Sequence, residues 1–265
     1  MKYTVLTLFP EISDAYFANS IMAKALNRGI IEYRAVNIRD YATDRHHTCD
    51  DAPYGGGPGM LMLAEPMGRA LDSVLSGYAM LSSEAGQHAD NTCKPRVIYL
   101  SPSGRPFNQS MARELAAEKE LILLCGRYEG IDQRIIDLYV DDEISVGDYV
   151  LSSGEVAALA LIDATYRLVE QVITPASLEE ESFERGLLEY PQYTRPEVYG
   201  TLRIPEVLLS GHHENIRRWR LEKRVEKTLT TRPDLIRLGE DRLLFDEETR
   251  KIIEEKRRGS GEGER

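Results

Sequence analysis

Two loops carry residue types that suit a ligand-binding site. The apolar run 121–125 stops abruptly at the polar loop 126–130, GRYEG, and a second apolar segment, 144–146, stops at the sequence GD and leads to Ser153-Gly154. In open α/β sheets, ligands bind outside the carboxyl ends of strands, where glycines let the backbone approach a ligand closely. The spacing alone leaves two interpretations open, a ligand site or two tight turns.

The glycine-rich segment 55–59, GGGPG, has the alternating glycines of a nucleotide-binding loop. Such a loop must follow an apolar strand and open a helix, but DDAPY precedes this one and no Lys-Ser/Thr pair follows it. We therefore expect no dinucleotide or nucleotide triphosphate site here. A flexible surface turn remains an open interpretation.

Histidines and cysteines are too scattered to indicate a metal site. His46-His47 and His212-His213 are adjacent pairs, whose side chains point different ways, and no matching ligand set accompanies them. No carboxylate spacing indicates a magnesium cage either. The sequence therefore predicts no dedicated metal site.

The composition is typical of a cytoplasmic globular protein. The chain has 265 residues, of which 42% are hydrophobic and 29% charged, enough for one large domain or two smaller ones. No apolar run approaches the ~20 residues of a membrane span, and the first residues lack the pattern of a signal peptide. The three cysteines are unpaired in spacing, which suits a reducing compartment. We expect a cytoplasmic location and no membrane partner.

A basic segment, 212–232, stands out from an acidic chain. The net charge is −11. This segment nevertheless holds seven Lys or Arg against three Glu, a balance of 7 − 3 = +4. Local patches rather than net charge decide nucleic-acid binding, so we expect this helix to face RNA phosphates. Its basic residues include Arg217, Arg218, Arg220, Arg224 and Lys227. Trp219, between them, is expected to pack into the core of a small domain rather than to stack on a base.

Strands and helices alternate along the first two thirds of the chain. The expected strands are 3–9, 32–38, 97–100 and 121–125, and the expected helices are 10–26, 66–75, 109–119 and 154–172. The succession 97–100, 109–119 and 121–125 is a βαβ unit, which implies a parallel sheet. The polar segment 77–94 is expected to be a loop.

The chain is expected to comprise an α/β domain and a helical domain. The α/β domain covers 1–172, and the acidic, aperiodic segment 173–190 is an interdomain linker. A mostly helical domain covers 191–258, and 259–265 is a disordered tail.

Several long strings, in the same order, resemble the bacterial tRNA (guanine-N1)-methyltransferases of the knotted (SPOUT) methyltransferase superfamily. They are LFPE at 8–11, DDAPYGGGPGM at 50–60, LSPSGR at 100–105, GRYEGID at 126–132, ISVGDYVLSSGE at 144–155, YTRPE at 193–197 and SGHHENIRRWR at 210–220. The likeness covers nearly the whole chain. It implies a mostly parallel sheet with helices on both faces and a deep trefoil knot at the cofactor loops. It also implies a small C-terminal helical domain and a homodimer with active sites shared between its chains.

The resemblance implies methyl transfer from S-adenosylmethionine to N1 of the guanine just 3′ of the tRNA anticodon, with Mg²⁺ as an additional cofactor. The chemistry requires a base for the N1 proton and a cation near O6. The matching motifs assign cofactor binding to Tyr99, Leu100, Ser101, Pro102, Gly126, Tyr128, Glu129, Gly130, Ser145, Val146, Gly147, Asp148, Tyr149, Val150, Leu151, Ser153 and Gly154. They assign substrate binding to Asp50, Arg127, Ser182, Arg217, Arg218 and Arg220, and catalysis to Glu181 and Arg167.

Two positions depart from the family pattern. Ser153 replaces a glycine, and it would cost about 1 kcal/mol or more if this position needs a positive φ. Glu181 stands where the family has an aspartate as general base; the two acids have similar intrinsic pKa values, and Glu180 is an alternative base. These departures keep two further hypotheses open. The chain could be a catalytically inactive RNA-binding protein of the same fold, or a knotted methyltransferase acting on another RNA position.

Overall fold

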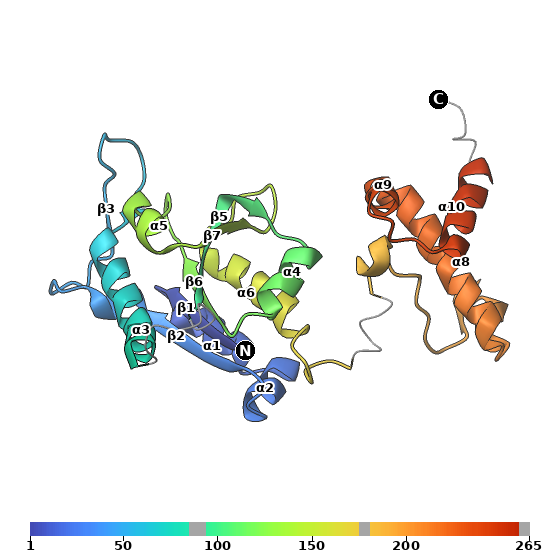
Figure 1. The fold of residues 1–265 in the computed structure, drawn as a ribbon, viewed down its shortest axis with the longest axis horizontal. Helices are drawn as coiled ribbons and strands as arrows, with labels where there is room; N and C mark the ends of the chain where they lie inside the picture. The colour runs from blue at the N-terminus through green and yellow to red at the C-terminus, as the bar shows by residue number, and fades with distance from the viewer. Residues whose placement is uncertain (85–93, 175–180, 260–265) are drawn as a thin grey trace. The chain divides into compact units, whose positions relative to one another are not determined.

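The chain folds into two units, each with its own hydrophobic core. The structure is a computed structural model that describes residues 1–84, 94–174 and 181–259, and the units are Met1–Ile173 and Thr174–Arg265 (Figure 1). The first unit is built on a five-stranded sheet in the order β2-β1-β6-β5-β7. Its strands are β1 (Lys2–Thr7), β2 (Glu32–Asn37), β5 (Arg96–Pro106), β6 (Glu120–Cys125) and β7 (Asp142–Ser145).

All neighbouring strands of this sheet pair in parallel, which confirms the predicted α/β class. Every residue of the central strand β6 is buried, as in a sheet covered on both faces. Its residues alternate between two cores: Leu121 and Leu123 face one, Ile122 and Leu124 the other. The sheet therefore needs helices on both sides.

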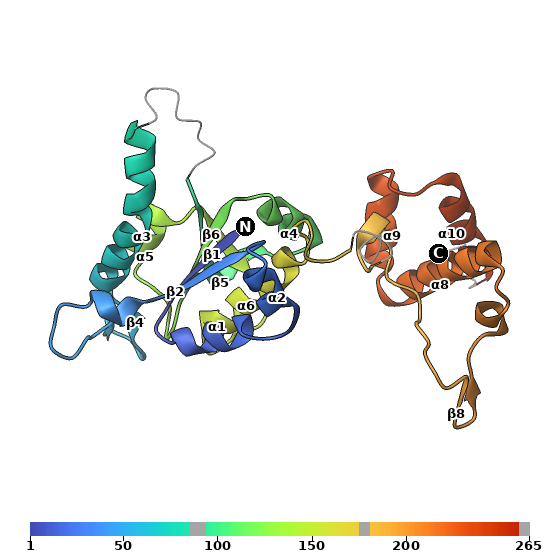
Figure 2. The same cartoon turned by 90° about the horizontal axis from the view of Figure 1, so that it is seen from below.

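Helices cover both faces of the sheet (Figure 2). The first core also takes residues from four of them, α1 (Pro10–Phe17), α2 (Ser20–Asn27), α4 (Gln109–Ala116) and α6 (Gly154–Tyr166). The second core takes residues from α3 (Ala64–Glu84) and α5 (Gln133–Tyr139). The parallel strands consequently present their carboxyl ends to a common edge, where the loops of interest begin.

Several expected boundaries differ from the structure, and the strand expected at 97–100 extends to Pro106. The helix expected over 10–26 is divided, because Asn19 is extended and its side-chain amide donates to the carbonyl of Ala15 in the last turn of α1. The loop expected from 77 is wrong as far as Glu84, since α3 continues to that residue. One interior glycine costs a helix only about 1 kcal/mol, which the buried face of α3 outweighs. The rest of that loop, 85–93, lies outside the described residues. Helix α6 ends at Tyr166 and not at 172. After Tyr166 the backbone hydrogen bonds join residues three apart instead of four: Leu168 donates to Thr165, and Val169 to Tyr166.

Strand β5 pairs with β7 twice. Leu100 lies opposite Ile144, and after a register shift Arg105 lies opposite the same residue. Gly104, within this excursion, allows the close approach. A Cβ there would come within 2.4 Å of the backbone nitrogen of Ile144. Glycine is therefore required where β5 approaches the backbone of β7 this closely.

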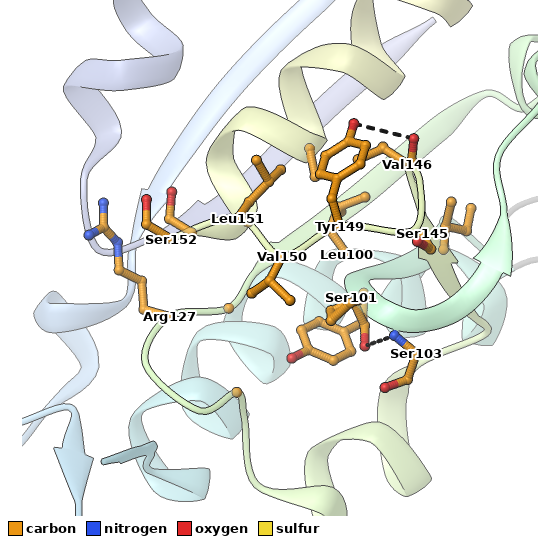
Figure 3. Close-up of a pocket in the computed structure, with 18 of the residues that line it drawn as sticks. Leu100, Ser101, Ser103, Arg127, Ser145, Val146, Tyr149, Val150, Leu151 and Ser152 are labelled. Atoms are coloured by element: carbon orange, nitrogen blue, oxygen red, sulfur yellow. Dashed lines mark hydrogen bonds between the residues drawn. The ribbon is translucent and has the colours of Figure 1, made fainter. Parts of the chain in front are cut away.

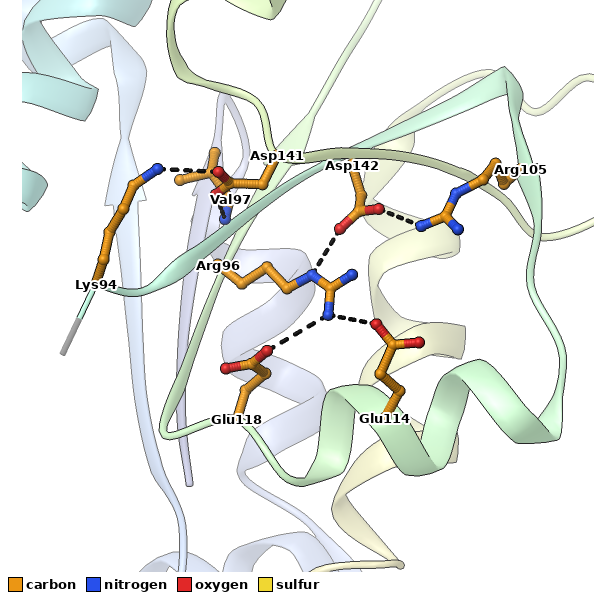
Figure 4. Close-up of polar contacts among 8 residues, drawn as sticks. All are labelled: Lys94, Arg96, Val97, Arg105, Glu114, Glu118, Asp141 and Asp142. Carbon is orange, nitrogen blue, oxygen red and sulfur yellow. Dashed lines mark hydrogen bonds and ion pairs between the residues drawn. The ribbon is translucent and has the colours of Figure 1, made fainter. Parts of the chain in front are cut away.

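Arginines at both ends of β5 share one carboxylate (Figure 4). Arg96 Nε donates to Asp142 at 2.6 Å, and Arg105 donates to the other oxygen of the same side chain. Arg96 also contacts Glu114 and Glu118 of the segment around α4. Burial alone would raise the pKa of Asp142, but the hydrogen bonds from Arg96 and Arg105 outweigh it and lower the pKa.

We expect Asp142→Asn to lower the free energy of unfolding by about 2 kcal/mol at pH 7, because two arginines lose a nearly buried charged acceptor. A carboxyl with a lowered folded pKa stabilises the fold above its unfolded pKa, near 3.9, and the effect is lost as pH falls through the folded pKa. The difference between wild type and variant should therefore shrink below about pH 4. Urea unfolding at pH 7 and pH 3 measures it. Glu118→Gln, which removes an exposed partner of Arg96, is the matched control and should cost under about 1 kcal/mol.

The second unit is helical, apart from a short hairpin. It contains η4 (Glu184–Gly186), η5 (Glu206–Leu209), α8 (His213–Thr231), α9 (Pro233–Asp241) and α10 (Glu247–Gly259), with the strands β8 (Val198–Tyr199) and β9 (Leu202–Arg203). Its core comprises Leu187, Val225, Ile236, Phe245, Ile252 and Ile253. Helix α8, which carries the basic segment, contributes Val225 to this core and is anchored by it.

Candidate functional site

A pocket of about 260 Å³ lies beside the middle of β5, where β6 and β7 end and α6 begins (Figure 3). Every residue assigned to cofactor binding lines it except Asp148, which the structure does not place there. The lining also includes Arg127, assigned to substrate binding. Four residues that the motif comparison did not indicate complete it: Ser103, Ile144, Ser152 and Ala157. Each of the four lies within three residues of an assigned position. Assigning whole segments to the pocket would therefore have predicted its lining better than assigning selected residues.

Glycines let the two main loops touch through their backbones. Gly154 donates its amide to the carbonyl of Gly126 at 2.8 Å, and Arg127 forms an antiparallel bridge with Ser153. A Cβ on Gly154 would come within 2.8 Å of the Cα of Cys125, and one on Gly126 within 3.0 Å of the Tyr99 ring. Side chains at these positions would push the loops apart or fill the pocket.

Ser153 does not carry the strain considered for it. Its φ is −164°, which is extended backbone, and it is the N-cap position of α6. A serine therefore fits here without penalty. The non-glycine residue that does adopt the left-handed region in these loops is Tyr128, with φ of 57°. The cost of that conformation is concentrated in the pocket wall.

The hairpin of β3 (Asp50–Asp51) and β4 (Leu61–Met62) borders the same loops. Glu129 donates its amide to the carbonyl of Met60, and Met62 donates to Gly130, both at 3.0 Å. A Cβ on Gly59 would come within 2.4 Å of Glu129 Oε1, so the glycine segment packs directly on this carboxylate. Because β4 and not a helix follows it, the segment is not a dinucleotide loop, as expected.

Groups at or beside the pocket have raised pKa values. Burial, and then the negative charge of Asp50, raise the pKa of Tyr128. Burial, and then the charge of Glu155, raise the pKa of the Cys125 thiol well above its ordinary value. A thiol held in its protonated form is a poor nucleophile. The pocket is consequently suited to holding a ligand that brings its own reactive group.

Arg167, one of the two residues assigned to catalysis, lies far from this pocket within one chain. Arg167 is the C-cap of α6, whereas Gly154 opens the same helix, and thirteen helical steps of 1.5 Å separate them by about 20 Å. Glu181 is half-buried and belongs to the second unit. Ser182, assigned to substrate binding, accepts a hydrogen bond from the amide of Glu189 at 3.1 Å. The alternative base Glu180 lies outside the described residues.

The basic segment is more structural than expected. Arg217 is bound by Glu214 and by Glu248 of α10, and Arg218 pairs with Glu222. Arg220 stacks on the ring of Tyr190 with 4.8 Å between guanidinium carbon and ring centroid. The prediction that Arg224 faces phosphate is wrong, since its side chain is buried and donates to the carbonyl of Leu188.

Trp219 was expected in the core of the second unit, but it lies outside that core. It is half-buried and its ring centroid is 6.3 Å from that of Tyr193. Helix α8 turns Val225 and Thr228 inward, and Trp219 lies on its flank instead.

Within the described ranges, no group of three or more His, Cys, Asp and Glu residues is placed to hold a metal ion. None of the helices within those ranges is both long and apolar enough to cross a bilayer.

The chain matches the family model described as tRNA (Guanine-1)-methyltransferase TrmD over residues 1–238. It is 58% identical over 255 residues to a Treponema denticola protein named tRNA (guanine-N(1)-)-methyltransferase, covering 96% of this chain and 98% of that protein. Proteins with the same name from Treponema pallidum and Borreliella burgdorferi are similar as well. The former is 54% identical over 255 residues, covering 96% of each chain. The latter is 55% identical over 237 residues, covering 89% of this chain and 92% of that protein.

Proposed function

Because the chain belongs to the tRNA (guanine-1)-methyltransferase family, we propose that it transfers a methyl group from S-adenosylmethionine to N1 of the guanine just 3′ of the tRNA anticodon. The observation that carries this proposal is the pocket, which gathers the middle of β5 and the loops after the parallel strands β6 and β7. An enzyme acting on tRNA in this way would work in the cytoplasm.

The pocket residues fit S-adenosylmethionine, which would supply an electrophilic methyl group. Gly126 and Gly154, whose backbones are hydrogen-bonded to each other, hold two of the lining loops together, and Leu100 provides an apolar wall. The carboxylate of Glu129 would favour the positive sulfonium. Asp148 is the one cofactor assignment without support from the pocket. Mg²⁺ assistance stays a prediction, which titrating the assay with Mg²⁺ and a chelator tests.

In the proposed mechanism, Glu181 acts as general base. It would accept the N1 proton of guanine as the N1 electron pair forms the bond to the methyl carbon. The methyl–sulfur bond of the bound S-adenosylmethionine would break at the same time, and S-adenosylhomocysteine would leave with that bond's electron pair. Negative charge that builds towards O6 is stabilised by the guanidinium of Arg167. The wall of the pocket holds the two reactants at bonding distance and in line, which removes much of the barrier.

We propose a homodimer in which each site draws residues from both chains. The pocket loop and the start of α6 expose apolar side chains to solvent in the single chain, including Val150 at 85% and Val156 at 53%. A second copy would cover them, since apolar patches of this kind mark interfaces. A second copy could also supply the Arg167 that one chain places about 20 Å from its own pocket.

The deep trefoil knot also belongs to this proposal. Two features support a chain crossing at the pocket: β5 pairs twice with Ile144 of β7, and Gly104 approaches the β7 backbone closely. The knot would hold the loops in register for the cofactor.

Transfer of radiolabelled methyl from S-adenosylmethionine to unmodified tRNA tests the function. We expect label at N1 of the guanine after the anticodon, located by nuclease digestion. Label at another nucleotide would favour the alternative RNA position, and tRNA binding without transfer would favour the inactive RNA-binding protein.

We expect Arg217→Ala with Arg218→Ala to weaken tRNA binding and flatten its dependence on salt. Each lost phosphate contact should reduce the log–log slope by about one. The i,i+4 pair of Arg218 with Glu222 is worth only a few tenths of a kcal/mol, so phosphate can displace it. Filter binding across a salt series measures the slope. Arg258→Ala, which removes a similar exposed i,i+4 pair on α10, is the control. An unchanged slope in the double variant would assign these arginines to the fold.

A further inference from the structure

We infer that Glu155 is a positioning residue, which holds the guanidinium of Arg127 at the edge of the pocket so that Arg127 contacts a phosphate of the RNA. The inference rests on the proposed function and adds to it a residue to which the motifs assigned no role.

Glu155 is a carboxylate buried beneath the pocket loops. It lies in the first turn of α6 and is 1% exposed. Its Oε1 accepts the hydroxyl hydrogen bond of Thr7 at 2.5 Å. Its Oε2 lies 3.6 Å from Arg127 Nε and has no hydrogen-bond partner among the described residues. A buried carboxylate requires a compensating cation, and Arg127 is the cation that faces it.

The guanidinium of Arg127 is fixed on two sides. Its carbon lies 4.1 Å from the centroid of the Phe9 ring, a cation–π contact, and its Nε side faces Glu155. The backbone of Arg127 is fixed as well, by its bridge to Ser153. The side chain of Arg127 is thus the point where three segments meet: the end of β1 with Thr7 and Phe9, the loop after β6, and α6.

The same contacts direct Arg127 away from the cofactor. Arg127 lines the pocket whereas Phe9 does not, so stacking on Phe9 places the guanidinium at the edge of the cavity. Figure 3 shows the side chain at the end of the pocket near Ser152, apart from Tyr149. The side chain remains 26% exposed.

A guanidinium held in advance is suited to a phosphate. Its planar fork matches two oxygens of the anion, and ordering the side chain before binding leaves less conformational entropy to lose. Glu155 supplies this order without reaching the surface. Its removal should therefore be detected in RNA affinity and not in cofactor affinity.

The test is Glu155→Gln, measured as the dissociation constants for tRNA and for S-adenosylmethionine. Glutamine keeps the volume and an oxygen for the Thr7 hydroxyl but removes the charge. We expect the dissociation constant for tRNA to rise about tenfold, as for a weakened charge-assisted contact, and that for the cofactor to stay within about twofold. KM for tRNA should rise while kcat at saturating tRNA stays within about twofold.

A double-mutant cycle shows whether Glu155 acts through Arg127. Arg127→Met alone and Arg127→Met with Glu155→Gln should bind tRNA equally weakly. Asp163→Asn, an exposed acid on the same helix that accepts from Tyr16, is the matched control and should bind tRNA as the wild type does. If Glu155→Gln does not fold, Arg127→Lys replaces it, because it keeps the charge but loses the fork and should also weaken tRNA binding.

Three outcomes would overturn the inference. The first is that Glu155→Gln or Arg127→Lys binds tRNA as tightly as the wild type, even if its melting temperature is lower. Either result would mean that the Glu155–Arg127 pair serves folding alone. The second is a double variant weaker than Arg127→Met alone, which makes Glu155 independent of Arg127. In either case an active wild type leaves the proposed function intact. The third is a wild type that neither binds nor methylates tRNA, which removes the proposed function together with the inference.

Discussion

Glu181→Gln lowers methyl transfer by ~10²-fold or more, the scale of a lost general base, while cofactor affinity stays within a few-fold. The glutamine keeps the size of the side chain but cannot accept the N1 proton. Single-turnover transfer of labelled methyl to tRNA measures the chemical step, and equilibrium dialysis measures cofactor affinity.

Glu181→Asp is the matched control for this prediction. It restores the carboxylate of the resembled family with one methylene less, and it should retain most of the activity that glutamine loses. Turnover near the wild-type level in Glu181→Gln would contradict the assignment and transfer the role to Glu180 or to another mechanism.

Two inactive variants restore activity to each other if sites are shared. Gly126→Trp fills the space beside the Tyr99 ring, which a Cβ alone would approach to 3.0 Å, and should abolish cofactor binding. When it is refolded with an equal amount of Glu181→Gln, about half of the dimers contain one chain of each variant. Each mixed dimer regains one intact site, so activity returns to about a quarter of the wild-type level.

The matched control places both substitutions in one chain and refolds it with wild type. With shared sites the mixed dimers are dead, and only the wild-type dimers, about a quarter of the total, are active. With sites built from single chains, each mixed dimer keeps one site and activity reaches about half. A first mixture as inactive as its parents, with mixed dimers demonstrated, would contradict shared sites.

Local patterns predicted the central strand well, because it is an apolar run covered on both faces. The strand expected at 121–125 differs from β6 by a single residue. Helix ends were predicted less well. The division at Asn19 depends on one side chain bonding to the backbone. Beyond Gly77, Tyr78 of α3 donates to Glu120 of β6, 42 residues away. Neither contact is visible in a periodicity.

The candidate site was predictable where loops follow strands and not where distant segments meet. The glycines of 126–130 and 153–154 indicated the pocket, because each follows an apolar run or opens an apolar helix. Glu155 gave no such indication, since an acid in the first turn of a helix ordinarily faces solvent and favours the helix dipole. Its burial depends on Thr7, 148 residues earlier in the chain.

The carboxylate of Asp142 also bears on the lifetime of the folded protein. It is bonded by Arg96 and Arg105, 46 and 37 residues away in sequence, so both bonds require β5 and β7 to be in place already. Contacts between segments so distant form late, after the loops between them have closed. Contacts absent from the transition state govern how fast a protein unfolds rather than how fast it folds. We therefore expect the bonds from the two arginines to Asp142 to slow unfolding more than they speed folding.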